Sequence, residues 1–162
     1  MQATFEQQLN SIDRQEREEA FKRLTEASAS GAITLPEQGH AFNLHCHSFF
    51  SFNGYGYSPT GLAWCGRKLG LRAMALVDFD VLDGVDEFLE TASALGLRSG
   101  AGMETRVFVP EFAEDEINSP GEPGVAYHVG IGFVSSTVKD PVLLHHLKAL
   151  AQNRTQTIIE RV

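Results

Sequence analysis

The chain has 162 residues, 43% hydrophobic and 21% charged, which is typical of one globular domain or of part of a larger one. Its 21 acidic residues against 13 Lys and Arg give a net charge of −8, which argues against a nucleic-acid backbone or an anionic membrane surface as the main partner, although nucleic acid is not excluded as a substrate. No apolar run is long enough to span a bilayer, the N-terminus is charged rather than signal-like, and the two cysteines form no CxxC pair, so we expect a cytoplasmic protein.

Residues 1–40 form the first predicted unit, an N-terminal helical segment. Apolar residues recur at helical spacing between residues 3 and 28, and the positions between them are mostly Glu, Gln, Arg and Lys. This pattern predicts one amphipathic helix that ends in the stretch 28–31. We expect the helix to cover the sheet that follows, and a partner-binding helix is the less favoured alternative.

Residues 41–162 form the second predicted unit, in which apolar strands alternate with amphipathic helices. Three strands are predicted first, at residues 42–46, 73–77 and 97–103. Ser58 followed by Pro59 predicts the start of one intervening helix, and Asp83 predicts the start of the next. Short links between strands and helices predict an α/β fold with a parallel sheet or barrel.

The remaining part of this unit is less regular. A short strand at 106–109 and a longer one at 125–133 bring the total to about five strands. Between them, residues 110–124 contain three prolines and an acidic cluster, which predicts an exposed loop. Asp140-Pro141 predicts the start of a last helix with one leucine-rich face.

His45 and His47 give the strongest chemical signal. In an extended strand, residues two apart project from the same face, so both imidazoles can reach one metal ion while Cys46 faces away. Asp78 and Glu104 then follow at equivalent places, at the carboxyl ends of the next two strands. Active sites of α/β enzymes lie at this edge of the sheet.

Each of the later candidates has a purely structural alternative. Asp78 could cap the turn after its strand, Glu104 could form an ion pair with Arg106, and His128, in the strand at 125–133, could be a core histidine. If the functional interpretation holds, two or three imidazoles and one or two carboxylates share one rim. Such mixed nitrogen and oxygen donors suit Zn, Mn or Fe better than Mg or Ca.

Four short stretches together resemble the successive motifs of a known family. They are residues 43–48 (NLHCHS), 75–80 (ALVDFD), 102–104 (GME) and 127–129 (YHV). In order and spacing they resemble the polymerase and histidinol phosphatase (PHP) family, over residues 41–162. The resemblance implies the N-terminal portion of a PHP-like distorted (β/α)7, TIM-like barrel, which is incomplete in this chain.

The resemblance also implies a metal-dependent phosphoesterase site. It places His45 and His47 on one metal ion, Glu104 as a bridging carboxylate and His128 on a second ion. These four residues are therefore both the implied metal ligands and the implied catalytic residues. In such sites the metals polarise the phosphoryl oxygen and activate a water molecule for in-line attack.

The chain departs from the family pattern at several positions. Asn43 stands where the motif usually opens with Asp, and Phe52 and Phe79 stand where the family has ligands of a third metal ion. The later His and Asp-x-His pair of the family are absent. We therefore expect no more than two divalent ions, and the paired phenylalanines indicate a coordinated loss of the third.

Two functions follow as hypotheses. The leading one is a hydrolase that cleaves a small-molecule phosphate ester by metal-activated water. The alternative is a catalytically weakened PHP-like module with a binding, regulatory or assembly role. Because about five strands cannot close a seven-stranded barrel, we also expect a homo-oligomer or a further downstream polypeptide to cover the open edge.

Overall fold

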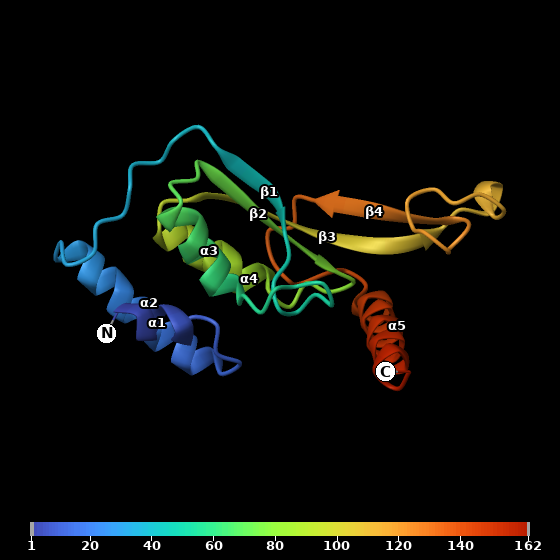
Figure 1. Ribbon diagram of the computed structural model, residues 1–162, viewed down its shortest axis with the longest axis horizontal. Coiled ribbons are helices and arrows are strands. Elements are labelled where there is room, and N and C mark those ends of the chain that lie inside the picture. The colour runs from blue at the N-terminus through green and yellow to red at the C-terminus, as the bar shows by residue number, and fades with distance from the viewer. Residues whose placement is uncertain (1, 162) are drawn as a thin grey trace.

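The computed structural model of the chain describes residues 2–161 and has five α-helices and four β-strands in this range (Figure 1). The helices are α1 (Gln2–Gln8), α2 (Arg14–Ala29), α3 (Pro59–Lys68), α4 (Val85–Ala94) and α5 (Pro141–Ile159). The strands are β1 (Phe42–Cys46), β2 (Ala73–Phe79), β3 (Arg98–Phe108) and β4 (Val125–Ile131), and a 3-10 turn at Pro110–Phe112 follows β3. None of the helices in this range is long and apolar enough to cross a membrane.

The four strands form one open sheet in the order β1-β2-β3-β4. β1, β2 and β3 are parallel, as predicted, whereas β4 runs antiparallel to β3. The strands predicted at 97–103 and 106–109 are one continuous β3, so the expected count of about five is wrong. Within residues 2–161 the fold is thus an open, mixed α/β sheet, and the full seven-stranded barrel is not present there.

The two faces of the sheet differ. α3 and α4 cover one face and enclose a core whose central members are Leu62, Met74, Leu76 and Phe88. Cys46 of β1 packs against this core, which confirms that it points away from the neighbouring histidines. The opposite face carries the side chains of His45, His47 and Glu104, so the candidate chemistry lies on the side that these helices leave uncovered.

The helix starts were predicted with mixed success. Ser58 Oγ accepts a hydrogen bond from Gly61 N at 2.8 Å and Pro59 opens α3, as expected. The predicted cap at Asp83 is wrong, because α4 begins after Gly84 without a side-chain cap, and the Asp83 carboxylate binds Lys148 of α5 instead.

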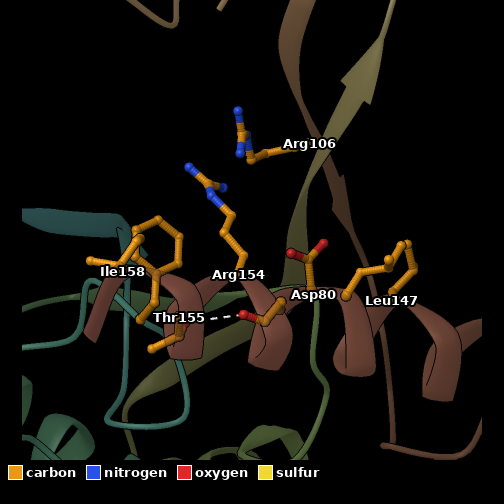
Figure 2. A pocket seen from close by; sticks show the side chains of 9 residues that line it. Asp80, Arg106, Leu147, Arg154, Thr155 and Ile158 are labelled. Carbon is orange, nitrogen blue, oxygen red and sulfur yellow. Dashed lines mark hydrogen bonds between the residues drawn. The ribbon is translucent and has the colours of Figure 1, made fainter. Parts of the chain in front are cut away.

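α5 lies apart from the layer formed by α3 and α4 (Figure 1). It begins as predicted, because the Asp140 carboxylate accepts hydrogen bonds from the first backbone N–H groups of the helix. No residue of α5 between 141 and 159 is fully buried. Its leucine-rich face lines a pocket with Arg106 and Asp80 rather than a closed core (Figure 2).

The N-terminal segment is two helices, so the prediction of one amphipathic helix over 3–28 is wrong. The chain leaves the helical path after α1 because Asp13 caps a new helix, its side chain accepting a hydrogen bond from Gln15 N. Leu9 and Leu24 pack with Trp64 of α3 in a second core. The segment therefore covers α3 rather than the sheet, and the proposed boundary between residues 1–40 and 41–162 stays a prediction.

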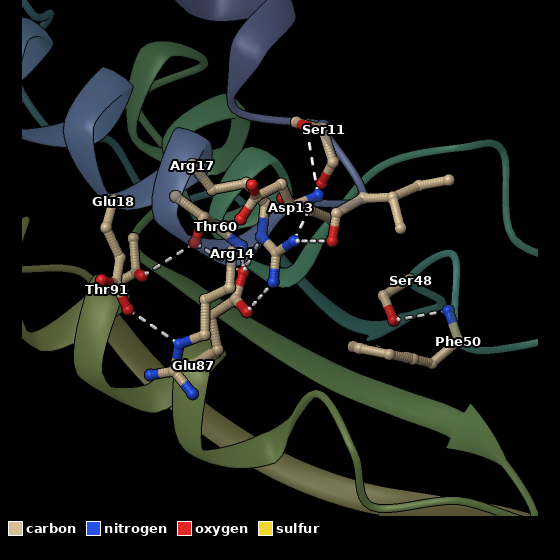
Figure 3. Close-up of polar contacts among 12 residues, drawn as sticks. Ser11, Asp13, Arg14, Arg17, Glu18, Ser48, Phe50, Thr60, Glu87 and Thr91 are labelled. Atoms are coloured by element: carbon tan, nitrogen blue, oxygen red, sulfur yellow. Dashed lines mark hydrogen bonds and ion pairs between the residues drawn. The ribbon is translucent and has the colours of Figure 1, made fainter.

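A buried ion pair fastens α2 to α4 (Figure 3). Arg17 Nε and Nη2 bind the two carboxylate oxygens of Glu87, at 2.8 and 2.5 Å, and Thr60 Oγ1 donates to the same carboxylate. Burial acts to raise the pKa of Glu87, but the hydrogen bonds from Arg17 and Thr60 outweigh it and the pKa is lowered. Arg17 also donates to the carbonyls of Ser11 and Ile12, which fixes the turn between α1 and α2.

Candidate metal centre

Three side chains from two strands meet on the uncovered face of the sheet. His45 lies in β1, His47 follows directly after it, and Glu104 lies in β3. His45 Nε2 is 2.9 Å from Glu104 Oε2, and His47 Nε2 is 3.8 Å from the same oxygen. One ligand atom from each residue lies within 4.8 Å of the others. The alternation of β1 brings the imidazoles together, as the sequence predicts.

The donor set fits a transition-metal ion. Two ligand bonds of about 2.1 Å at a tetrahedral angle place their ligand atoms about 3.4 Å apart, and the two contacts to Glu104 Oε2 bracket that value. Two imidazoles and one carboxylate suit Zn, Mn or Fe. The side chain of His45 is 51% exposed, so one side of the cluster is open to water and to a ligand.

The protonation state of His47 also suits coordination. Burial lowers its pKa from the ordinary value, and the neighbouring His45 lowers it further, while Glu104 acts in the opposite direction. His47 is therefore neutral at pH 7, and a neutral imidazole has the free lone pair that a metal ion requires.

Aromatic rings line one side of the cluster. Phe79 stacks on the ring of His47, with centroids 5.4 Å apart and planes 21° apart. Phe52 and Tyr127 contact Phe79 in turn, with centroid distances of 4.9 and 5.5 Å. Phe79 is buried whereas Phe52 is 56% exposed. The two phenylalanines that differ from the family pattern are thus in contact with each other and with a candidate ligand.

His128 lies elsewhere. It pairs with Thr105 across the antiparallel strands, and paired residues share a face of the sheet, so its side chain lies on the face opposite to Glu104. It is exposed there. The structure brings His45, His47 and Glu104 together and does not bring His128 to them. Tyr127, its neighbour in the chain, is on the side of Glu104, which the sequence analysis missed.

Asp78 and Arg106 do not bind the partners that the sequence analysis considered for them, the candidate metal ligands for Asp78 and Glu104 for Arg106. Asp78 is buried and accepts hydrogen bonds from Ser48 N and Ser48 Oγ, both at 2.6 Å. Its carboxylate therefore holds the turn after β1, whereas the structural alternative placed it at the turn after its own strand, β2. Burial raises the pKa of Asp78 to about 6, although the two hydrogen bonds from Ser48 oppose this shift. Arg106 forms its ion pair with Glu122 rather than with Glu104.

Several known proteins are similar to part of the chain in sequence. No family model matches it. An error-prone DNA polymerase from Cutibacterium acnes is 43% identical over 68 residues, which are 42% of this chain and 6% of the polymerase. A 5'-3' exoribonuclease from Haemophilus influenzae is 30% identical over 121 residues, which are 75% of this chain and 39% of the exoribonuclease. The resemblance to the PHP family is confirmed.

The PHP-like chain therefore spans only a part of each of these relatives. Its fold is similar to that of an amidohydrolase from Chromobacterium violaceum, whose structure holds bound sulfate and no metal. The TM-score is 0.52 at 23% identity, over 71% of this chain and 34% of that chain. At this identity the likeness shows the mixed α/β fold alone.

Proposed function

We propose that His45, His47 and Glu104 hold a divalent metal ion and that the chain carries part of a metal-dependent phosphoesterase site. The observation that supports this most is the convergence of three donors within 4.8 Å from strands that are far apart in the sequence. His128 is left out of the ligand set of this ion because its side chain lies on the other face of the sheet.

Each residue has a distinct task in this proposal. A bound divalent ion activates water as a nucleophile and withdraws charge from a phosphoryl oxygen. His47 supplies a neutral imidazole whose plane is fixed by the ring of Phe79. Glu104 is buried and supplies the negative charge that keeps a cation in place, and the exposed side of His45 admits water and substrate.

The proposed substrate is a small phosphate ester. The net charge of −8 disfavours a polyanionic partner, although the relatives named as a DNA polymerase and an exoribonuclease make nucleic acid the first substrate to test beside it. The site would need the same chemistry for both, because a water molecule activated by a bound ion would have to reach a phosphorus atom in either case.

The test is hydrolysis of p-nitrophenyl phosphate and of a short 5'-phosphorylated RNA by the full chain with Mn or Zn. We expect a chelator to abolish turnover and added metal to restore it. Glu104→Gln should lower kcat/KM by about tenfold or more, since it removes a charged ligand. The matched control is His146→Ala on the exposed surface of α5, which should be unchanged. Hydrolysis that resists the chelator would contradict the proposal.

A second function is supported by the aromatic wall of the site. Phe52 and Phe79 cannot coordinate a cation, and the cluster of residues 2–161 has three protein ligands. A module that binds metal weakly and serves binding or assembly would have the same features. In that case the chain would bind Mn or Zn through His45 and His47 and hydrolyse neither substrate.

A further inference from the structure

A pocket lies between α5 and the carboxyl end of the sheet (Figure 2). Its volume is about 170 Å³. Phe52, Leu147, Leu150 and Ile158 give it apolar walls, and Arg106 and Arg154 bring two guanidinium groups to it. An apolar pocket with a few convergent polar groups is the usual form of a small-molecule site.

The two guanidinium groups converge on one carboxylate. Arg106 Nη2 binds Glu122 Oε2, and Arg154 Nη2 is 3.8 Å from Glu122 Oε1. Both groups therefore lie within reach of a single oxyanion of about the size of a carboxylate. Arginine forks match the oxygens of phosphate as well as those of carboxylate.

Arg106 has hydrogen-bonding capacity that the protein does not use. Its Nε is buried, and no acceptor within residues 2–161 makes a hydrogen bond to it. A buried guanidinium N–H without an acceptor is costly, so a ligand oxygen would gain from binding there. Arg154 reaches the pocket from α5. Its guanidinium group lies over the ring of Phe52, with Cζ 5.7 Å from the ring centroid, and this cation–π contact helps to hold it in position.

Glu122 is suited to exchange with a ligand. It belongs to the loop 110–124 between β3 and β4, and its side chain is 37% exposed. The carboxylate is therefore partly open to water, and an anion of higher charge can compete with it for the two guanidinium groups. The acidic side chain that lines the pocket is Asp80. Its Oδ1 accepts a hydrogen bond from Thr105 Oγ1 at 2.5 Å.

Two aromatic rings in contact, those of Phe79 and Phe52, lie between the metal cluster and the pocket. Phe79 contacts His47 on one side and Phe52 on the other, and Phe52 lines the pocket. Arg106 follows Glu104 by two residues in β3, so both side chains lie on the same face of the sheet. A ligand in the pocket would thus lie beside the proposed metal ion.

We infer that Arg106 and Arg154 form a binding site for the phosphoryl group of a phosphate ester with an apolar or aromatic group, and that the Glu122 carboxylate occupies this site when no ligand is bound. The inference deepens the proposed function by naming the two arginines that bind the phosphoryl group and the apolar or aromatic group that the ester carries. It rests on the proposed function only for the claim that the bound phosphate ester is hydrolysed. Phosphate binding by the two arginines does not depend on it, because neither arginine is a proposed ligand of the metal ion.

The test is isothermal titration of the full chain with inorganic phosphate, in the presence of a chelator. The variant Glu122→Gln removes the competing charge and should tighten phosphate binding by about tenfold. This is the effect expected when phosphate no longer has to displace one charge-assisted contact. Adding Arg154→Gln to that variant should abolish the gain, and Arg154→Lys should restore only part of it because the fork is lost. The matched control is Arg98→Gln, at the opposite end of β3.

Three results would overturn the inference. The first is an equal phosphate affinity of the wild-type chain and Glu122→Gln. The second is an equal loss of phosphate affinity on Arg98→Gln and on Arg154→Gln, and the third is no detectable phosphate binding by any variant. A change in the far-UV circular dichroism of Glu122→Gln would mean that this variant does not fold like the wild type. In that case the wild-type chain is compared with Arg154→Gln at high phosphate concentration, and equal phosphate binding by these two chains rejects the site. Phosphate binding without hydrolysis would reject the proposed function alone, and chelator-sensitive hydrolysis without phosphate binding would reject the pocket alone.

Discussion

His45 and His47 are the residues on which the metal hypothesis depends most directly. We predict that His45→Ala or His47→Ala lowers bound Zn, Mn or Fe by about tenfold or more, because each removes one of three convergent donors. Elemental analysis of the purified variants measures this, with His146→Ala on α5 as the control. Unchanged metal content in both variants would reject the cluster as a metal site.

Asp78 gives a prediction about pH. Its folded-state pKa of about 6 lies above the ordinary value of 3.8 for an aspartate, so the folded chain holds this proton more tightly than the unfolded chain does. The resulting stabilisation is complete below about pH 4 and is lost as the pH rises through about 6. Asp78→Asn, which keeps an acceptor for Ser48 N, should therefore gain stability relative to wild type between pH 4 and pH 7, by up to about 3 kcal/mol.

Urea unfolding of both chains at several pH values in this range measures the difference. Comparing the two chains cancels the titration of all other groups. Asp115→Asn, in the exposed loop, is the control and should show no such trend. A difference between wild type and Asp78→Asn that is independent of pH would show that burial does not raise this pKa.

At the residue scale, the sequence predicted the candidate ligands whose placement depends on local geometry. The period of two in β1 is enough to bring His45 and His47 together, and the position of Glu104 at the carboxyl end of its predicted strand placed it at the same edge of the sheet. The position of His128 could not be predicted, because the pairing register of β4 on β3 decides which of two neighbouring residues lies on the face of Glu104. β4 is antiparallel, and Tyr127 and Val129 take those places.

Among the elements, the helices with strong local signals were predicted best. The caps at Ser58 and Asp140 are local and were correct. The break between α1 and α2 was missed because the apolar spacing continues through it, and its cause is partly tertiary. Arg17 is fixed by Glu87, which is 70 residues away, and it holds the carbonyl groups of the turn.

The pair of Arg17 and Glu87 therefore carries a prediction for α2. Arg17→Ala leaves the buried Glu87 carboxylate without its cation and should destabilise the chain by about 3–5 kcal/mol. Arg23→Ala, which removes an exposed pair with Glu19 on the same helix, should cost less than about 1 kcal/mol. Urea unfolding at pH 7 compares them, and equal costs would show that the buried pair does not fasten α2.

The double variant Arg17→Met with Glu87→Leu separates the charge from the packing. With both charges removed, no unpaired carboxylate stays buried, so most of the lost stability should return. If the double variant is as unstable as Arg17→Ala, the loss comes from the shape of the arginine side chain rather than from its charge.

In the whole molecule, β1 and β4 lie at the two edges of the sheet, and neither edge is paired within residues 2–161. Large apolar residues are exposed at both edges, with Phe42 of β1 65% exposed and Ile131 of β4 64% exposed. Open edges of this kind pair readily with other strands. The direction and number of the strands could not be predicted from apolar runs alone, because a strand has the same period in either direction.

We predict that the 162-residue chain either self-associates through these edges or binds metal weakly and turns over poorly. An open sheet leaves β1, which carries His45, without support on its outer side, and a ligand cluster that is not rigidly held binds its ion less tightly. Analytical ultracentrifugation and metal titration of the same sample test both branches. Phe42→Lys and Ile131→Lys should shift any oligomer toward monomer, because a charge on an edge strand opposes pairing, whereas Tyr55→Lys in an exposed loop should not. A monomer that holds two metal ions tightly and hydrolyses phosphate esters at full rate would refute the prediction, since the open sheet would then suffice for a complete site.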